Sequence, residues 1–338
     1  MNTKTELTGQ GVSSTSTILE SVEYKTLYPA ITPFASDWLE TGDGHEVYYE
    51  QSGNPNGLPV IFLHGGPGSS CKEHHRCFFN PQKYHIILMD QRGAGRSRPS
   101  GDLTRNTTHH LITDMEMIRK KLNIEKWLLF GGSWGATLAL LYAQTHTSKV
   151  LGLILRGTFL ARSMDADWFF KDGASRLFPK AWSRFTQHIS TNERKDVLGA
   201  YYQRLNIDDK EVQQETTREW DAWGGAVVLG DAFNAGELDG EVPDTAIAQA
   251  RIETHYGMNR YFIKENQIVD NAIRLLDIPC TLIHGKKDYM CPIESSFTLA
   301  QAIPNANFIE LPHATHLAHG DEMIDALVSA TDRFVLTS

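Results

Sequence analysis

The stretch that decides the fold is Trp127–Ala143, which reads WLLFGGSWGATLALLYA. Its first four residues form an apolar run typical of a buried strand, and its last eight have the composition of a helix. Between them lies Ser133, with glycines on both sides. Side chains two residues before and after the serine would collide with the crossing helix and strand, so the turn needs glycine there. The pattern predicts a strained strand–turn–helix unit that holds the Ser133 hydroxyl outward at a helix N-terminus.

Short apolar runs elsewhere in the chain alternate with helical segments. We expect strands at 46–50, 58–63, 84–89, 127–130, 150–155, 281–284 and 307–311, and helices at 106–122, 136–143, 293–303 and 323–336. The first of these strands alternates as a half-exposed strand does, and the others read as buried. This order predicts an α/β protein with a mostly parallel sheet covered by helices. With a serine on a strand-to-helix turn, the order indicates the α/β-hydrolase fold.

The alternation stops after residue 156 and resumes near residue 277. The intervening segment is rich in aromatic and charged residues at helical spacing, which predicts a helical cap inserted over the active site. We therefore divide the chain into a flexible N-terminal tail at 1–22, a hydrolase core at 23–156 and 277–338, and a cap domain at 157–276.

Composition limits the possible functions. The net charge of −9 over 338 residues argues against nucleic acid or an anionic membrane as a partner. We find no secretory leader and no apolar run of about 18 residues. The four cysteines have no CxxC spacing, so we expect reduced thiols in a cytoplasmic protein. The histidine pairs at 74–75 and 109–110 lack further ligands at metal spacing, and we expect neither a metal nor a cofactor. The oligomeric state stays open.

A serine hydroxyl needs a histidine base, and that histidine needs a carboxylate to orient it. In this fold the chain order is serine, then acid, then histidine, with the last two after late strands. Asp288 follows the predicted strand at 281–284, and His316 follows the strand at 307–311. We therefore predict Ser133, Asp288 and His316 as the catalytic triad. Nearby alternatives that fit the strand ends less well are His313, His319, Glu294 and Asp321.

The glycine-rich stretch HGGPG at 64–68 follows another predicted strand. Such a loop lets backbone N–H groups point at a reaction centre, and a tetrahedral intermediate needs two donors of this kind. We assign these oxyanion-hole donors to Gly66 and to Trp134, the residue after the serine. We expect His64 to bond within its loop, and the segment 90–97 to be an ordered turn that supports it.

Taken together, several stretches resemble the prolyl aminopeptidase (proline iminopeptidase) family over nearly the whole chain. They are 42–45, 64–68, 90–97, 131–140, 155–157, 173–175, 251–256, Asp288 and 291–292. The resemblance implies a cytoplasmic, cofactor-free enzyme that removes an N-terminal proline from small peptides. It supports the same triad, and it implies that Glu253 in the cap binds the substrate's N-terminal ammonium. A buried cation needs such a paired anion. We also place Trp223 and Arg156 among the substrate-binding residues.

The cap departs from the family at the expected Trp-x-x-Trp-Glu motif, because Gly224 stands where the second ammonium-binding carboxylate is expected. Gly257 replaces an expected aromatic residue, and Thr158 replaces an expected apolar one. We place all three changes in the cap pocket and hypothesise that substrate choice has drifted from simple N-terminal proline. Asp221 or Glu219 could supply the missing charge.

The leading interpretation is thus a serine aminopeptidase or amidase that acts on small peptides or amides through an acyl-enzyme. The alternative is an esterase, lactone hydrolase or tailoring acyl hydrolase with the same triad and a different cap specificity. A non-enzymatic binding protein is disfavoured, because the residues expected for every catalytic role are present.

Overall fold

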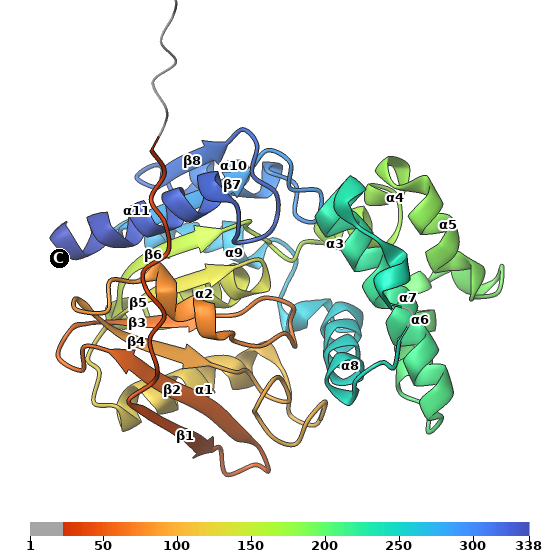
Figure 1. The fold of residues 1–338 in the computed structure, drawn as a ribbon, viewed down its shortest axis with the longest axis horizontal. Coiled ribbons are helices and arrows are strands. Elements are labelled where there is room, and N and C mark those ends of the chain that lie inside the picture. The colour runs from red at the N-terminus through yellow and green to blue at the C-terminus, as the bar shows by residue number, and fades with distance from the viewer. Residues whose placement is uncertain (1–22, 239, 338) are drawn as a thin grey trace, which may run out of the picture.

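The computed structural model describes residues 23–337 apart from residue 239, so the predicted tail at 1–22 lies outside the described residues. Its centre is a sheet with the strand order β1-β2-β4-β3-β5-β6-β7-β8 (Figure 1). The strands are β1 (Ala35–Glu40), β2 (Glu46–Gly53), β3 (Leu58–Leu63), β4 (Tyr84–Met89), β5 (Trp127–Gly132), β6 (Val150–Arg156), β7 (Cys280–Gly285) and β8 (Asn307–Leu311). Strand β2 pairs antiparallel with β1 and β4, and the other neighbours are parallel. The predicted mostly parallel sheet is confirmed.

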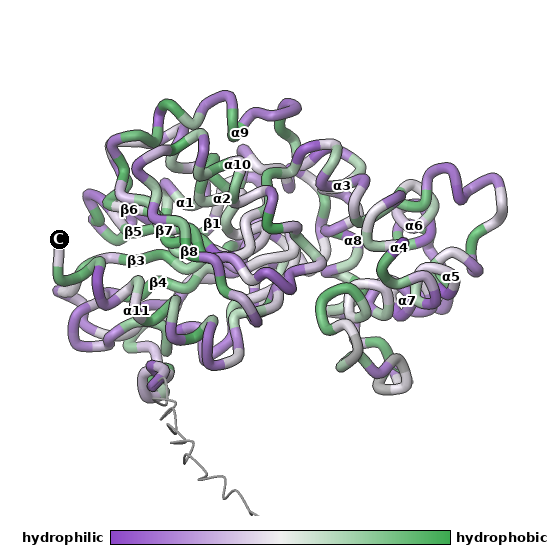
Figure 2. The backbone as a smooth tube through the Cα atoms, turned by 90° about the horizontal axis from the view of Figure 1, so that it is seen from above, coloured by the Kyte–Doolittle hydropathy of each residue, from purple (hydrophilic) through white to green (hydrophobic). Residues whose placement is uncertain are grey.

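Helices cover both faces of the sheet. They are α1 (Thr108–Lys121), α2 (Trp134–Thr145), α9 (Gln267–Asp270), α10 (Glu294–Ala302) and α11 (Asp321–Thr337). Successive side chains of a strand point to opposite faces. In β3, Ile61 and Leu63 join the core under α1, α2 and α10, while Val60 and Phe62 join the core under α11. Figure 2 shows hydrophobic residues concentrated along the central strands.

A helical insertion occupies the segment between β6 and β7. Its helices are α3 (Ser163–Phe170), α4 (Ala174–Leu177), α5 (Pro179–Gln187), α6 (Val197–Leu205), α7 (Lys210–Leu229) and α8 (Asp244–Met258). The insertion has its own aromatic core, which includes Phe185, Tyr201 and Trp223. Helix α8 lies between the sheet and helices α6 and α7 (Figure 1). It is tied to the segment before α1, because the His255 ring bonds the Asn106 carbonyl and the Tyr256 hydroxyl donates to the Asn106 side chain.

Two details at the sheet edge differ from the sequence prediction. Strand β1 was not expected, because its sequence ASDWLE lacks an apolar pattern and much of it is exposed. Strand β2 was expected to be half-exposed, but residues 47–50 are buried. Glu50 tolerates burial because Arg76 and Arg96 donate to its two carboxylate oxygens at 2.6 and 2.9 Å. Among the described residues, no helix is both long and apolar enough to cross a membrane.

The turn between β5 and α2 has the expected strain. Ser133 has φ 56° and ψ −125°, a backbone conformation that residues with a side chain rarely adopt. A Cβ atom on Gly131 would overlap the carbonyl of Gly135, and a Cβ on Gly135 would overlap the carbonyl of Leu63 at the end of β3. The glycines therefore let α2 start directly against β3, with Ser133 at the carboxyl edge of the sheet.

Candidate active site

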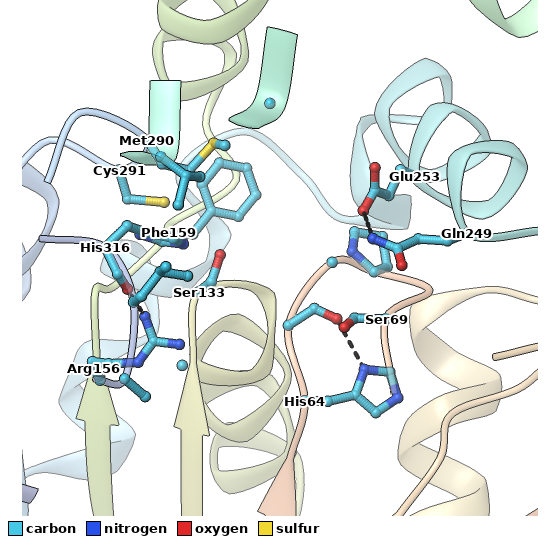
Figure 3. Close-up of a pocket in the computed structure, with 18 of the residues that line it drawn as sticks. His64, Ser69, Ser133, Arg156, Phe159, Gln249, Glu253, Met290, Cys291 and His316 are labelled. Atoms are coloured by element: carbon cyan, nitrogen blue, oxygen red, sulfur yellow. Dashed lines mark hydrogen bonds between the residues drawn. The ribbon is translucent and has the colours of Figure 1, made fainter. Parts of the chain in front are cut away.

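Ser133 opens into a cavity of about 510 Å³ between the carboxyl edge of the sheet and the helical insertion. Residues of both parts line it, among them Gly66, Ser133, Asp221, Glu253, Cys291 and His316. In Figure 3, Ser133 lies between His316 and Cys291 on one side and Glu253 and Gln249 on the other. The cavity therefore brings together predicted site residues that are up to 250 positions apart in the chain.

Asp288 and His316 form a buried pair beside Ser133. The Nδ1 atom of His316 donates to Oδ2 of Asp288 at 2.8 Å. The other oxygen of Asp288 accepts the backbone N–H groups of Met290 and Cys291 at 3.0 and 2.8 Å. Burial opposes ionisation, but the nearby His316 and His284 rings hold the pKa of Asp288 well below its usual range. The carboxylate is therefore ionised, and the Nε2 atom of His316 is left to accept a proton.

His284 is a supporting residue that sequence reasoning missed. Its Nε2 atom donates to the Cys291 carbonyl at 2.8 Å and lies 3.3 Å from Oδ2 of Asp288. Its Nδ1 atom accepts the Ser296 hydroxyl at 2.7 Å. The signal in the sequence was a polar residue at the buried end of β7, four positions before Asp288.

Arg156 lines the cavity, but the hydrogen bond that its guanidinium makes is with the protein backbone. Its guanidinium donates to the backbone carbonyl of His316 and fills the space that a side chain at Gly132 would need. Burial lowers the pKa of this guanidinium. Arg156 therefore anchors the loop that carries His316, and its expected part in substrate binding stays a prediction.

The glycine-rich loop after β3 is fixed by a chain of hydrogen bonds. His64 Nδ1 donates to the Gly65 carbonyl, and its Nε2 accepts the backbone N–H of Gln91, each at 2.9 Å. The Gln91 side chain in turn accepts the indole N–H of Trp134 at 2.8 Å. Burial lowers the pKa of His64, which keeps the ring neutral. The loop therefore lies against Ser133, where the backbone of Gly66 and Trp134 is predicted to bind an oxyanion.

None of the alternative acids and bases takes part in the Asp288–His316 pair. His319 borders the cavity but is exposed, and the exposed His313 bonds Glu322 through its backbone N–H. Glu294 pairs with Arg162 at 2.6 Å, and Asp321 is the first residue of α11.

Helix α7 turns Asp221 and Gly224 toward the cavity, but not Trp223. Trp223 is 1% exposed, and its indole N–H donates to the Phe169 carbonyl at 3.2 Å. The expectation that Trp223 binds substrate is therefore wrong, because its position along the helix points it into the core of the insertion. At Gly224 a Cβ atom would meet nothing within 4 Å, so the cavity is open there.

The other two departures from the family pattern, Gly257 and Thr158, were expected in the catalytic cavity but do not line it. Gly257 lines a second cavity of about 550 Å³, where an added Cβ would contact Leu198 at 3.0 Å. Thr158 is buried outside the lining of both cavities, and its hydroxyl has no partner among the described residues. Only Gly224 therefore changes the space in front of Ser133.

Besides Asp165, which is paired with Arg162 at 2.7 Å, two carboxylates line the cavity. Glu253 accepts the indole N–H of Trp220 at 2.5 Å and the Gln249 amide at 2.9 Å, and burial raises its pKa to about 7. Asp221 has no hydrogen-bond or ion-pair partner in the described part of the chain, and burial raises its pKa to about 6. Glu219, the other candidate, is bound by Arg184 at 2.7 Å and lies outside the cavity lining. An unpaired carboxylate in such a desolvated place favours a cationic ligand.

The fold and this arrangement define the class of protein, and the comparisons agree. A model of the α/β hydrolase fold family matches residues 59–322. Among solved structures, a hydrolase from Pseudomonas aeruginosa is similar with a TM-score of 0.60 at 18% identity, covering 90% of this chain and 99% of that one. A hydrolase of this fold from Bacillus anthracis has a TM-score of 0.55 at 18% identity, covering 90% and 99%. At this identity the likeness concerns the fold alone.

Closer relatives identify the family. A proline iminopeptidase from Xylella fastidiosa is 46% identical, with 92% of this chain and 100% of the relative covered. One from Arabidopsis thaliana is 41% identical over 92% and 83%, and one from Neisseria meningitidis is 40% identical over 90% and 98%. The chain belongs to the proline iminopeptidase family of α/β hydrolases.

Cys291 gives a direct probe of the cavity. Its thiol lines the cavity, whereas Cys280 is buried in β7 outside the lining. Burial raises the pKa of the Cys291 thiol well above its usual value, so alkylation by N-ethylmaleimide will be slow. Once mass spectrometry shows modification, we expect kcat/KM on an activated ester to fall about tenfold or more, because the adduct fills space next to Ser133.

The matched variants separate the two thiols. Cys291→Ser should retain its activity under the same treatment, and Cys280→Ser should remain sensitive. Full activity in wild-type protein that is alkylated at Cys291 would contradict this prediction.

Proposed function

We propose that this chain is a serine aminopeptidase that removes the N-terminal residue, proline or a similar one, from small peptides or amides. The observation that carries the proposal is the shared cavity. A serine on a strained turn, an imidazole oriented by an ionised carboxylate and two half-buried carboxylates all border it. The names of the relatives, which are 40–46% identical, support the same reaction.

In the proposed mechanism, Nε2 of His316 accepts the proton of Ser133 as Oγ attacks the scissile carbonyl carbon. Backbone N–H groups of Gly66 and Trp134 stabilise the negative oxygen of the tetrahedral intermediate. His316 then donates the proton to the leaving amine, which frees the shortened peptide and leaves an acyl ester on Ser133. A water molecule, activated by the same ring, hydrolyses the ester and releases the free amino acid.

The two carboxylates give this hydrolase a preference for a free N-terminus. A substrate that reacts at Ser133 while its ammonium lies against Glu253 and Asp221 is cleaved after its first residue. Asp221 supplies the charge that was expected at position 224, from one helical turn earlier on α7. The bound ammonium compensates the cost of desolvating both carboxylates, so substrates without a cation lose this contribution.

We further propose that the enzyme works in the cytoplasm and without a nucleic acid or membrane partner. The net charge of −9 and four buried, unpaired thiols support this assignment.

Ser133 can be tested with a fluorophosphonate probe and two substrates, L-proline p-nitroanilide and p-nitrophenyl acetate. We expect the wild-type protein to be labelled and to cleave the anilide, and Ser133→Ala to lose labelling and about 10³-fold or more in kcat/KM. Ser69→Ala, which removes another serine of the cavity lining, is the control and should still be labelled. An unlabelled wild-type protein would refute a serine mechanism. Rapid cleavage of the ester without any cleavage of aminoacyl anilides would favour the esterase alternative.

Loss of either cavity carboxylate should affect only substrates that carry an ammonium group. We expect Asp221→Asn and Glu253→Gln each to raise KM for L-proline p-nitroanilide about 10- to 100-fold, the effect of losing one charged contact. The KM for p-nitrophenyl acetate, which has no ammonium, should change less than twofold. Glu211→Gln, an exposed carboxylate on the same helix, is the control. Equal losses on both substrates would contradict an ammonium-binding role.

Burial of Glu253 also predicts a pH-dependent stability. Its pKa rises from 4.5 to about 7 on folding, so the folded state holds the proton more tightly than the unfolded state. The stability contribution of the neutral form is complete below pH 4.5 and is lost as the pH rises through 7. We therefore expect Glu253→Gln to exceed the wild type in Tm by about 2–4 °C at pH 8.5. The difference should shrink at pH 5, and a constant difference in thermal melts would contradict the prediction.

A further inference from the structure

The chain takes an unusual backbone path directly after α8. Arg260, Tyr261 and Phe262 have φ angles of 49°, 53° and 56°, so three consecutive residues with side chains are left-handed. Only glycine adopts this region without cost, and asparagine tolerates it better than most residues. Strain of this kind persists where the surroundings impose it, and it is commonest at functional sites.

This path carries the ring of Tyr261 into the wall of the active site. The side chain is 8% exposed and stacks on Trp134, the residue after Ser133, with ring centroids 5.7 Å apart. Its ring also meets Phe159 edge-on at 4.9 Å, and Thr108 donates to its backbone carbonyl at 2.5 Å. The Tyr261 hydroxyl has no hydrogen-bond partner among residues 23–337 without 239, so packing and the backbone alone hold the ring. Burial raises the pKa of this phenol.

The ring stands where the two cavities meet. The catalytic cavity of about 510 Å³ and the second cavity of about 550 Å³ share three lining residues, Ala166, Phe170 and Tyr261. Ala166 is too small to close the space, and Phe170 is held by ring contacts with Phe169 and Trp220. On the far side lies Gly257, which has no side chain to fill the second cavity. Of the three shared residues, Tyr261 is thus the large one that lies on the strained turn.

We propose that Tyr261 is a specificity-determining residue that separates the two cavities and so limits the size of the N-terminal residue that fits beside Ser133. The proposal rests on the proposed function, in which the acyl part of the substrate occupies the catalytic cavity. With the ring in place the cavity accepts small N-terminal residues such as proline. Without it, the second cavity becomes available to larger side chains such as those of leucine and phenylalanine.

The test uses the 7-amido-4-methylcoumarin derivatives of proline, leucine and phenylalanine. Tyr261→Gly removes the wall at a position where glycine is unstrained, and Tyr261→Phe keeps the ring. Phe262→Gly is the matched control, because it relieves the same backbone strain and removes an aromatic ring that lines neither cavity. If Tyr261→Gly lacks a cooperative thermal transition, Tyr261→Asn replaces it.

We expect the ratio of kcat/KM for the leucine and phenylalanine derivatives over proline to rise about tenfold or more in Tyr261→Gly. The ratio should stay within about twofold of the wild type in Tyr261→Phe and Phe262→Gly. An unchanged ratio in Tyr261→Gly or Tyr261→Asn, with the proline derivative still cleaved by the wild type, overturns the role of Tyr261 and leaves the proposed function intact. A wild type that cleaves none of the three derivatives overturns both.

Discussion

The close approach of α2 to the end of β3 is the constraint on which the rest of the structure depends. A single Cβ atom at Gly135 would push the helix away from the Leu63 carbonyl and lift Ser133 from its place. The same approach brings the loop after β3 against the serine and lets Gln91 join His64 to Trp134. The serine, its neighbouring backbone donors and the loop that supports them are therefore one rigid unit, and the residues at β6, β7 and β8 are arranged around it.

The hydrolase core and the Asp288–His316 pair could be predicted from the sequence, because strand ends and chain order determine where these two residues lie. The limits of β3, β4 and β8 agree with the expected ones to the residue. The edge strand β1 has no apolar pattern to reveal it. His284 was missed because its role depends on hydrogen bonds to Ser296 and Cys291, which no spacing along the chain encodes.

The helical insertion was predicted as a unit, but its inner surface was not. A motif such as Trp220–Gly224 places its residues on a helix, while the rotation of that helix decides which of them face the cavity. Trp223 turned into the aromatic core, and Asp221 turned toward Ser133. Gly257 and Tyr261 show the same limit, since the left-handed turn after α8 cannot be inferred from the residues Arg260–Phe262.

The attachment of α8 has a mechanical consequence for the cavity. Asn106 binds both His255 and Tyr256, so the helix that carries Glu253 is fastened to the hydrolase core. Asp221 belongs to α7, whose packing is within the insertion. The two carboxylates therefore lie on different helices, which the hydrogen bond from Trp220 to Glu253 links. Any displacement of α7 relative to α8 alters the spacing of the negative charges, and with it the attraction for a cation entering the cavity.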